Sequence, residues 1–376
     1  MTPPRREGHT YAGLMTVASP QRTLASLFDP RSNSLNALRL VLAALVIVSH
    51  SWPLTGREPE PALGGANLGV WAVLGFFAIS GFLITRSRLS GRPTHTFYRA
   101  RALRILPAFL VCLVVVAFVF APVSLLLDPA GSWSLQSAAT FVARNLALYP
   151  PYIFQGGIAG TLTTTPFLEL WNGPLWTLFW EAACYIAIGV AVSVIPRTRL
   201  PLVLAIAFAA LTVAGLAHAL GVVTIPELFA RALPLFLAFL AGALVLLFAD
   251  RLRVNALGVL IAVAVLVAAV LLGRVPELGT PSIAYLLLAV GAVLPLQRVG
   301  AKYDISYGIY IYGWPVQQLL ALWLGPDFPL PLYIALALAL TAPLAWLSCV
   351  LVERPALALK TREKPQIVAT EPESTR

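Results

Sequence analysis

The chain has 376 residues, of which 59% are hydrophobic and only 11% are charged. Soluble domains are about half apolar and a quarter charged, so this composition excludes an ordinary soluble globular protein. The net charge of +10 would indicate an anionic partner in a soluble protein, whereas in a membrane protein the placement of the charges carries the information.

The apolar residues form ten runs separated by short breaks that carry Arg and Pro. Runs of about twenty residues have the length needed to cross a hydrocarbon layer of roughly 30 Å. The sequence therefore predicts an all-α, polytopic membrane protein of about ten transmembrane helices. The expected segments are 38–51, 68–85, 105–125, 175–195, 200–220, 228–249, 254–272, 283–296, 305–324 and 330–352.

Polar residues flank this membrane region at both ends. We expect a polar N-terminal tail at 1–32, one membrane domain at 33–358 and a polar C-terminal tail at 359–376. The N-terminal tail lacks an apolar stretch followed by a small-residue cleavage site, which argues against a cleaved signal peptide. No Cys or His cluster has metal-ligand spacing, so no metal site is expected.

Lys and Arg alternate in number between successive connections. The connection at 86–104 carries six arginines, whereas the opposite set of connections holds only Arg57, Arg144 and Arg274. Cytosolic connections of membrane proteins carry the excess of Lys and Arg. Both termini are therefore predicted to be cytosolic.

The first segment carries two ionisable side chains, Arg39 and His50. A charge at the bilayer centre costs about 2.5–3.5 kcal/mol on insertion scales, so one that persists usually faces a cavity or a partner. A spacing of eleven residues places the two on nearly the same helix face, about 16 Å apart. Snorkelling or an interhelical bond is the plainer interpretation of each residue alone.

Two further motifs lie near the predicted cytosolic boundary. Ser80, within the run 76–81, follows two phenylalanines and precedes a glycine. Close helix packing is its plainer role, although the hydroxyl could line a substrate entrance. Arg101 and Arg104 are neighbours on one helical surface. They could anchor the helix against anionic lipid or bind the phosphates of a nucleotide-like anion such as coenzyme A.

The fourth segment buries an acid. Glu181 lies about two turns into an otherwise apolar helix, and such a group must be protonated or paired with a cation or histidine. His50 is expected at a comparable depth, so we predict a Glu181–His50 pair. In the ninth segment, Pro315 implies a kink whose freed carbonyl must be satisfied by neighbouring groups.

Taken in order, these motifs resemble the membrane acyltransferase 3 family, whose members modify bacterial surface polysaccharides, lipid-linked glycans and some secondary metabolites. The resemblance covers about residues 33–358. The matching elements are Arg39 with His50, 76–81, 101–104, 175–178 with Glu181 and Tyr185, 306–310 and 353–355. Many family members have a histidine where this chain has Gly313, so His50 must act alone or with Glu181.

The resemblance implies a membrane-embedded O-acyltransferase of the bacterial inner membrane. Its donor would be a cytosolic acyl-CoA, expected to be acetyl-CoA, and its acceptor a hydroxyl of a carbohydrate or glycan-like molecule. No permanently bound cofactor, metal or nucleic acid is expected. The expected roles are catalytic for His50, Glu181 and Arg39, acyl-CoA-binding for Arg101, Arg104, Ser80 and Tyr307, and channel-lining for Trp176, Asn172 and Phe77.

Two other functional classes fit the same buried charges. A transporter or flippase for a lipid-linked glycan would use them to gate a pathway. A non-catalytic membrane scaffold would use them to join helices. Turnover of acyl-CoA by the purified protein separates the enzyme from both alternatives.

Overall fold

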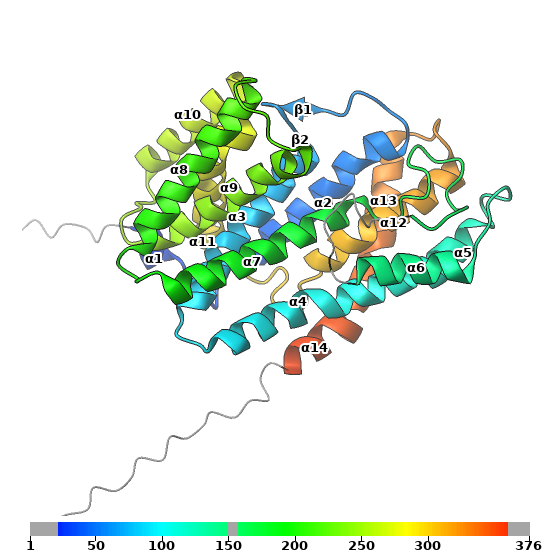
Figure 1. Ribbon diagram of the computed structural model, residues 1–376, viewed down its shortest axis with the longest axis horizontal. Helices are drawn as coiled ribbons and strands as arrows, with labels where there is room; N and C mark the ends of the chain where they lie inside the picture. Colours follow the sequence, from blue (N-terminus) through cyan, green and yellow to red (C-terminus); the bar gives the residue numbers. More distant parts are fainter. Residues whose placement is uncertain (1–21, 147, 149–156, 360–376) are drawn as a thin grey trace, which may run out of the picture.

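Helices make up most of the structure, a computed structural model that describes residues 22–146, 148 and 157–359 (Figure 1). Within those residues the only sheet is an antiparallel pair, β1 (Ala62–Leu63) and β2 (Ala66–Asn67). The helical elements are α1 (Leu24–Leu27), α2 (Leu35–Leu54), α3 (Leu68–Leu89), α4 (Thr94–Val115), η1 (Val116–Phe120), α5 (Ala121–Ser124), α6 (Leu135–Asn145), η2 (Gly173–Leu175), α7 (Trp176–Val194), α8 (Leu200–Ala219), α9 (Glu227–Leu247), α10 (Ala256–Leu271), η3 (Val275–Gly279), α11 (Thr280–Val293), α12 (Ser306–Leu324), α13 (Leu330–Ser348), η4 (Cys349–Glu353) and α14 (Arg354–Ala358).

Each of the ten predicted segments coincides with one of these helices or a continuous run of them. Eight stretches in the described part of the chain are long and apolar enough to cross a membrane. The other two are α10, an apolar helix of 16 residues, and α12, which contains polar side chains. The helical membrane fold is confirmed in this coarser form, and the count of ten crossings stays a prediction.

The polarity of α12 follows from its position inside the protein. Its residues from Ser306 to Gln318 are buried, because the helix packs between α2 and α13. Gln317 donates from Nε2 to the Ile47 carbonyl and the Ser51 hydroxyl, both at 2.9 Å. Such bonds between helices satisfy polar groups that lipid cannot solvate.

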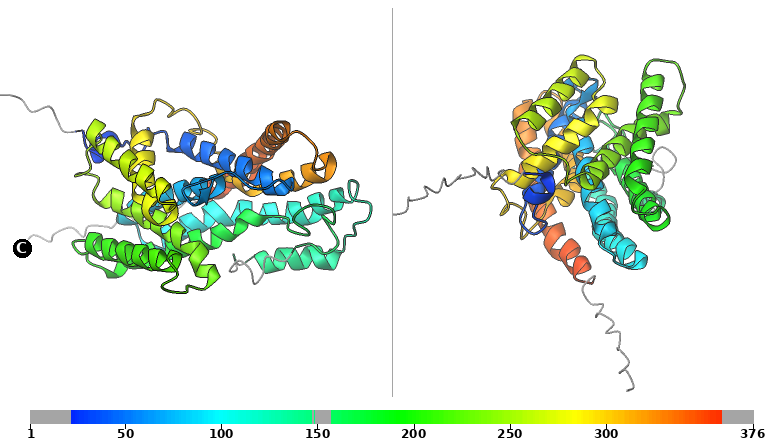
Figure 2. Two further views of the ribbon diagram at one scale, coloured as in Figure 1. Left: turned by 90° about the horizontal axis from the view of Figure 1, so that it is seen from above. Right: turned by 90° about the vertical axis from the view of Figure 1, so that its left-hand side faces the viewer.

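Helix α3 occupies the centre of the bundle and packs against α2, α7, α9 and α11. Its closest approach is to α9, where two glycines remove the side chains between the backbones. A Cβ atom at Gly81 would collide with the carbonyl oxygen of Phe239, and one at Gly242 would collide with that of Ala78. Small residues permit this kind of backbone contact between membrane helices. By contrast, α8 lies at the periphery and packs on α9 (Figure 2).

The proline in α12 frees a carbonyl, as predicted. Pro315 has no N–H to bond the Ile311 oxygen one turn earlier, and that oxygen instead accepts from Asn172 Nδ2 at 2.8 Å and Cys112 Sγ at 3.4 Å. The structure gives Asn172 a structural role, and its expected place in a channel wall stays a prediction. Its side chain, in a residue only 3% exposed, holds the broken turn of α12.

This arrangement predicts coupling between Asn172 and Pro315. Asn172→Ala is expected to lower the free energy of unfolding by about 1–3 kcal/mol, since it removes a partner from a buried carbonyl. In a Pro315→Ala background the same change should cost less, because alanine restores the N–H that can bond the Ile311 oxygen. Thermal unfolding of the four proteins in detergent measures the coupling, and equal losses in both backgrounds would contradict it.

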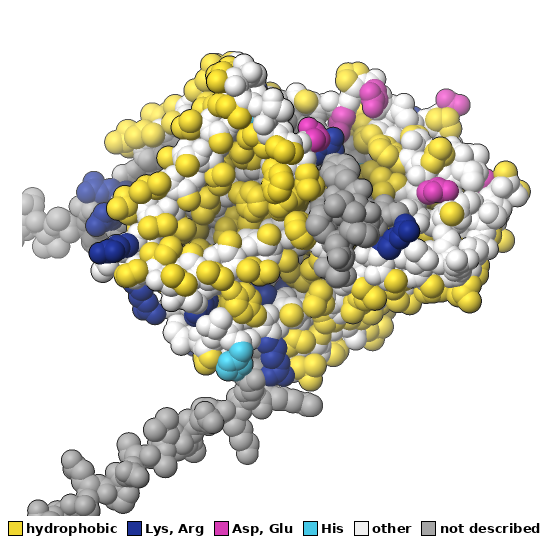
Figure 3. All heavy atoms as spheres, viewed as in Figure 1, with side chains coloured by type: hydrophobic (Ala, Val, Ile, Leu, Met, Phe, Trp, Pro, Cys, Tyr) yellow, Lys and Arg dark blue, Asp and Glu magenta, His cyan; other side chains and the backbone are white. Residues whose placement is uncertain are grey.

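The described chain ends lie on one side of the bundle. Arg86, in the last turn of α3, stacks its guanidinium over the ring of Phe28 at 5.4 Å, and Arg99 donates to the Leu359 carbonyl at 3.3 Å. Lys and Arg gather toward this side, whereas Asp and Glu lie mainly on the opposite one (Figure 3). This separation fits the predicted topology, and the assignment of the basic side to the cytosol stays a prediction.

Part of the predicted N-terminal tail is docked on the membrane domain. Leu24 is fully buried and donates its backbone N–H to the Leu252 carbonyl at 2.8 Å, while Val254 donates to Arg22 at 2.9 Å. Thr23 caps α1 by accepting from the backbone N–H of Ser26. The remaining tail residues, 1–21 and 360–376, lie outside the described part of the chain.

Candidate active site

A charged network joins four elements near the basic side. Asp304, in the α11–α12 connection, accepts at Oδ2 from Arg39 of α2 at 2.8 Å and from Arg104 of α4 at 2.7 Å. Arg104 also lies 3.4 Å from Glu353 at the end of η4. The other Asp304 oxygen accepts from the Ser306 hydroxyl at 2.6 Å.

Asp304 is held as a carboxylate by these partners. Burial alone would raise its pKa, but the charges of Arg39 and Arg104 and the hydrogen bonds from Ser306 hold the pKa well below its usual range. The sequence interpretation missed Asp304. Asp304 directly precedes the ninth predicted segment, at the same membrane boundary as Arg39 and Arg104. This position could have indicated that it pairs with them.

Arg101 differs from the two arginines that Asp304 pairs. It lies just under one turn before Arg104 on α4, and its side chain forms no ion pair or hydrogen bond within the described residues, although Glu181 attracts it from a longer distance. Its Nε atom is buried without a partner, and the guanidinium lies 6.0 Å from the Phe97 ring centroid. Arg101 is therefore the arginine of this group that can bind an anion without breaking an ion pair.

Glu181 pairs with hydroxyl groups, not with His50. Its Oε1 accepts from Ser80 of α3 at 3.0 Å and from Tyr185, one turn later on α7, at 2.5 Å. The predicted Glu181–His50 pair is wrong. The predicted partner, His50, lies on α2 at a comparable depth in the membrane. Helix α3 packs against both α2 and α7, and its residue Ser80 bonds Glu181 instead.

His50 lies near the C-terminal end of α2, where Trp314 packs against its ring. The two rings meet edge to face with centroids 4.9 Å apart. Trp314 is fixed in turn by a 3.0 Å bond from its Nε1 to the Leu170 carbonyl, and Gly173 leaves room for the indole. The Nδ1 atom of His50 is buried and has no hydrogen-bond partner in the described part of the chain.

Gly313 allows the close approach of α12 to α2. A Cβ atom there would lie 2.8 Å from Cγ1 of Ile47, tighter than ordinary contact. A histidine at this position would have to displace the Ile47 side chain. The space that a histidine at position 313 would need is thus occupied by Ile47 of α2.

Three cavities with shared walls lie between Arg101 and His50, and we call this series the passage. The inner cavity, about 90 Å³, is lined by Arg101, Arg104 and Tyr185 among others. The middle cavity, about 50 Å³, includes Phe77 in its wall. The outer cavity, about 380 Å³, includes His50 and Trp176. The residues common to the inner and middle cavities are Arg39, Ser80, Glu181 and Tyr307, and those common to the middle and outer cavities are Val73, Thr177 and Tyr310.

The middle cavity is the smallest of the three. There the hydroxyls of Thr177 and Tyr310 form a 2.6 Å hydrogen bond between α7 and α12. The ring of Tyr310 also meets that of Phe76, with centroids 5.8 Å apart. The sequence interpretation did not single out Thr177 and Tyr310, although both lie inside motifs that it quoted.

A further carboxyl group lies near the outer cavity. Glu60, in the α2–β1 connection, accepts from Asn67 Nδ2 at 2.8 Å and from the Ser49 hydroxyl. Burial raises the pKa of Glu60 above its ordinary value, although the hydrogen bonds from Ser49 and Asn67 oppose the shift. Because Asn67 and Gly69 line the outer cavity and Ser49 accepts from the Gly69 N–H, this cluster fixes part of the cavity wall.

The structure thus places every predicted site residue except Asn172 in the walls of the passage. It keeps Glu181 and His50 in different cavities. Among the described residues there is no group of three or more His, Cys, Asp or Glu side chains that could hold a metal ion.

Comparison with known proteins points to one chemistry. Residues 32–350 match a family model described as an acyltransferase domain. The chain is 30% identical, over 84% of its length and 94% of the relative, to an "O-acetyl transferase" of Shigella phage Sf6. It is 28% identical, over 88% of its length and 94% of the relative, to "Nodulation protein 10" of Rhizobium leguminosarum bv. viciae. No solved structure gives a match.

Proposed function

The chain belongs to the acyltransferase family whose model spans its membrane domain, and from that premise we propose that it moves an acyl group from acyl-CoA to a hydroxyl of a carbohydrate or glycan-like acceptor. Acetyl is the proposed acyl group, by analogy with the relative named O-acetyl transferase. The observation that carries the proposal is the passage, whose walls link Arg101 on the basic side with His50 near the opposite one.

The donor is proposed to enter from the basic side, which faces the cytosol in this topology. Arg101 would bind a phosphate group of coenzyme A, since a guanidinium offers several donors to phosphate oxygens. The nucleotide is too large for the middle cavity of about 50 Å³, so it would remain at the entrance. The narrow pantetheine arm would extend along the passage toward His50. Along α2, the eleven residues from Arg39 to His50 span roughly 16 Å.

We propose that Arg39 and Arg104 position the helices at the entrance. Their ion pairs with Asp304 hold α2, α4 and the start of α12 together, which fixes the shape of the entrance. Glu181, Ser80 and Tyr307 line the path of the arm. Their oxygens could accept from, or donate to, the amide groups of pantetheine.

His50 is proposed to act as the general base. An imidazole has an unperturbed pKa near neutrality and suits proton transfer there. It would take the proton of the acceptor hydroxyl as that oxygen attacks the thioester carbonyl. When the C–S bond breaks, the imidazolium returns the proton to the leaving sulfur, which yields an ester and free coenzyme A thiol.

The acceptor is proposed to bind in the outer cavity, about 380 Å³. Trp176 offers an apolar face with a polar edge, and Asn67 and Thr177 offer hydrogen-bonding groups near His50. Such a mixture of an aromatic wall and a few polar groups is typical of sites for small ligands. We place the enzyme in a bacterial inner membrane, where it would receive its two substrates from opposite sides.

Two measurements test the proposal. Purified protein in proteoliposomes should release coenzyme A thiol from acetyl-CoA when a glycan acceptor is present. Mass spectrometry of surface glycans and small metabolites from cells with and without the gene should reveal one acyl group that is missing without it. An unchanged profile together with no thiol release from any acyl-CoA would reject the proposed reaction.

A further inference from the structure

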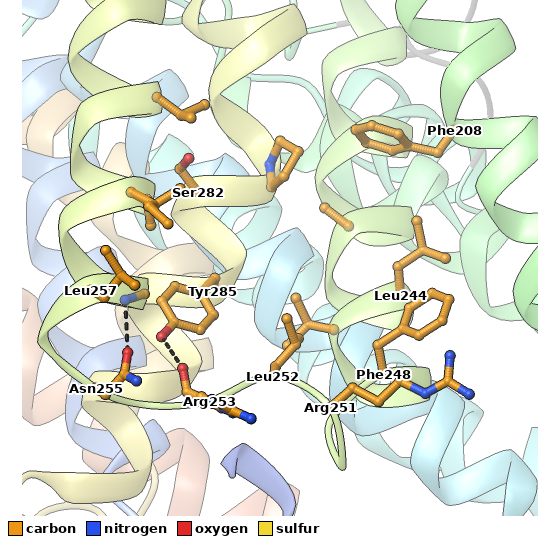
Figure 4. A pocket seen from close by; sticks show the side chains of 17 residues that line it. Phe208, Leu244, Phe248, Arg251, Leu252, Arg253, Asn255, Leu257, Ser282 and Tyr285 are labelled. Atoms are coloured by element: carbon orange, nitrogen blue, oxygen red, sulfur yellow. Dashed lines mark hydrogen bonds between the residues drawn. The ribbon is translucent and has the colours of Figure 1, made fainter. Parts of the chain in front are cut away.

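A second large cavity lies outside the passage, in a groove between two pairs of helices (Figure 4). Its volume is about 650 Å³. Phe208 of α8, Leu244 of α9 and Phe248 directly after α9 form one wall, and Leu257 of α10 and Tyr285 of α11 form the other. All four helices belong to the apolar part of the chain, so the groove opens where lipid is expected.

The walls of the groove are apolar along most of its length. On α10 the lining residues Leu257, Ile261 and Val265 recur every four positions and are 64%, 55% and 45% exposed. They therefore form one face, about 12 Å long, that the protein leaves uncovered. An unbranched hydrocarbon chain matches such a face in chemistry and in width.

One end of the groove is cationic. Arg251 and Arg253, in the α9–α10 connection, both line it and are exposed. Neither side chain forms an ion pair with a described residue, and the Arg251 guanidinium lies 6.0 Å from the Phe248 ring centroid. The neighbouring acid Asp250 is exposed as well and pairs with neither.

The connection that carries these arginines is anchored by hydrogen bonds. Leu24 and Ala25 of the N-terminal segment donate backbone N–H groups to Leu252 and Ala249, and the Tyr285 hydroxyl donates to the Arg253 carbonyl at 2.7 Å. Asn255 caps α10 through the Gly258 N–H at 2.8 Å. The backbone that presents the two cations is thus held on both sides of the groove.

We propose that this groove binds one anionic phospholipid, with its phosphate on Arg251 and Arg253 and an acyl chain between α8–α9 and α10–α11. Arginine near the membrane surface attracts anionic headgroups, and the apolar walls hold the chain that a free phosphate lacks. The site is separate from the passage, because the two share no lining residue. It would fix α8 and α10, the least buried helices of the bundle, to its centre.

The test measures which lipid stays with the protein. Protein reconstituted in vesicles of equimolar phosphatidylcholine and phosphatidylglycerol is re-extracted in mild detergent and analysed by native mass spectrometry. The wild type should retain one phosphatidylglycerol. The double variant R251A/R253A should retain it about tenfold less or worse, whereas R197A/R199A, which removes two exposed arginines from the α7–α8 connection, should behave as the wild type.

A second pair of variants tests the acyl-chain part of the groove. Val265→Trp should fill it and reduce retention without a change of charge, whereas Val263→Trp, at a position on α10 that is 41% exposed but outside the groove, should not. The proposal would be overturned if R251A/R253A retained as much phosphatidylglycerol as the wild type, or if both double variants lost it equally. It would also be overturned if the wild type carried no lipid and was paired with a second copy of the chain.

Discussion

His50→Ala is expected to lower kcat for acyl transfer by about 100- to 10,000-fold, the range that a positioned general base contributes. The Michaelis constant for acyl-CoA should change little, because Arg101 lies in the inner cavity and His50 in the outer one. Folding should survive. The His50 ring borders an existing cavity, and its Nδ1 forms no hydrogen bond within the described residues, so truncation leaves no buried partner unsatisfied.

The control for this variant is the other membrane histidine. His218, at the end of α8, either accepts at Nδ1 from the Ile225 N–H or donates from Nδ1 to the Val223 carbonyl, depending on its tautomer, and His218→Ala should retain transfer. Thermal unfolding in detergent would show that both variants are folded. Full activity in His50→Ala would remove the base from the proposed mechanism while leaving the family assignment intact, since that rests on the whole domain.

Arg101 and Arg104, three residues apart, are expected to respond differently to alanine. Arg101→Ala should raise the Michaelis constant for acyl-CoA by about 10- to 100-fold, the loss of one charge-assisted hydrogen bond, with little change in the unfolding midpoint. Arg104→Ala should destabilise the protein by about 3–5 kcal/mol, because it leaves Asp304 and Glu353 short of a partner. Residue Glu353 is 2% exposed, so water cannot compensate for it.

The donor itself supplies the matched control for Arg101. Acetyl-pantetheine carries the thioester but lacks the nucleotide and its phosphates. Arg101→Ala should therefore raise the Michaelis constant for acetyl-CoA and leave that for acetyl-pantetheine unchanged. Equal effects on both donors, or equal destabilisation by the two arginine variants, would contradict the assignment of Arg101 to phosphate binding.

Helix positions could be predicted because hydropathy and length alone decide what crosses a lipid layer. All ten expected segments coincide with helices. Hydropathy alone does not identify α12 as a membrane-crossing helix. Its residues Gln317 and Gln318 lower the mean hydropathy, yet they are fully buried against protein and expose no polar group to lipid.

Side-chain partners were harder to predict, because a sequence gives depth along a helix but not the direction in which each helix faces its neighbours. Glu181 and His50 were assigned to each other by depth, yet Ser80 of the intervening α3 takes the bond. Asn172 was expected at a channel wall, whereas its side chain donates to the Ile311 carbonyl that Pro315 leaves free. Only the three-dimensional packing decides between such choices.

The reciprocal glycine contacts of α3 and α9 have a consequence for motion during turnover. Since Gly81 and Gly242 bring the two main chains into direct contact, these helices cannot rotate or slide past each other without a steric clash. They form a fixed frame. We therefore expect any widening of the passage during turnover to come from between α7 and α12, where the hydroxyls of Thr177 and Tyr310 bond across the two walls.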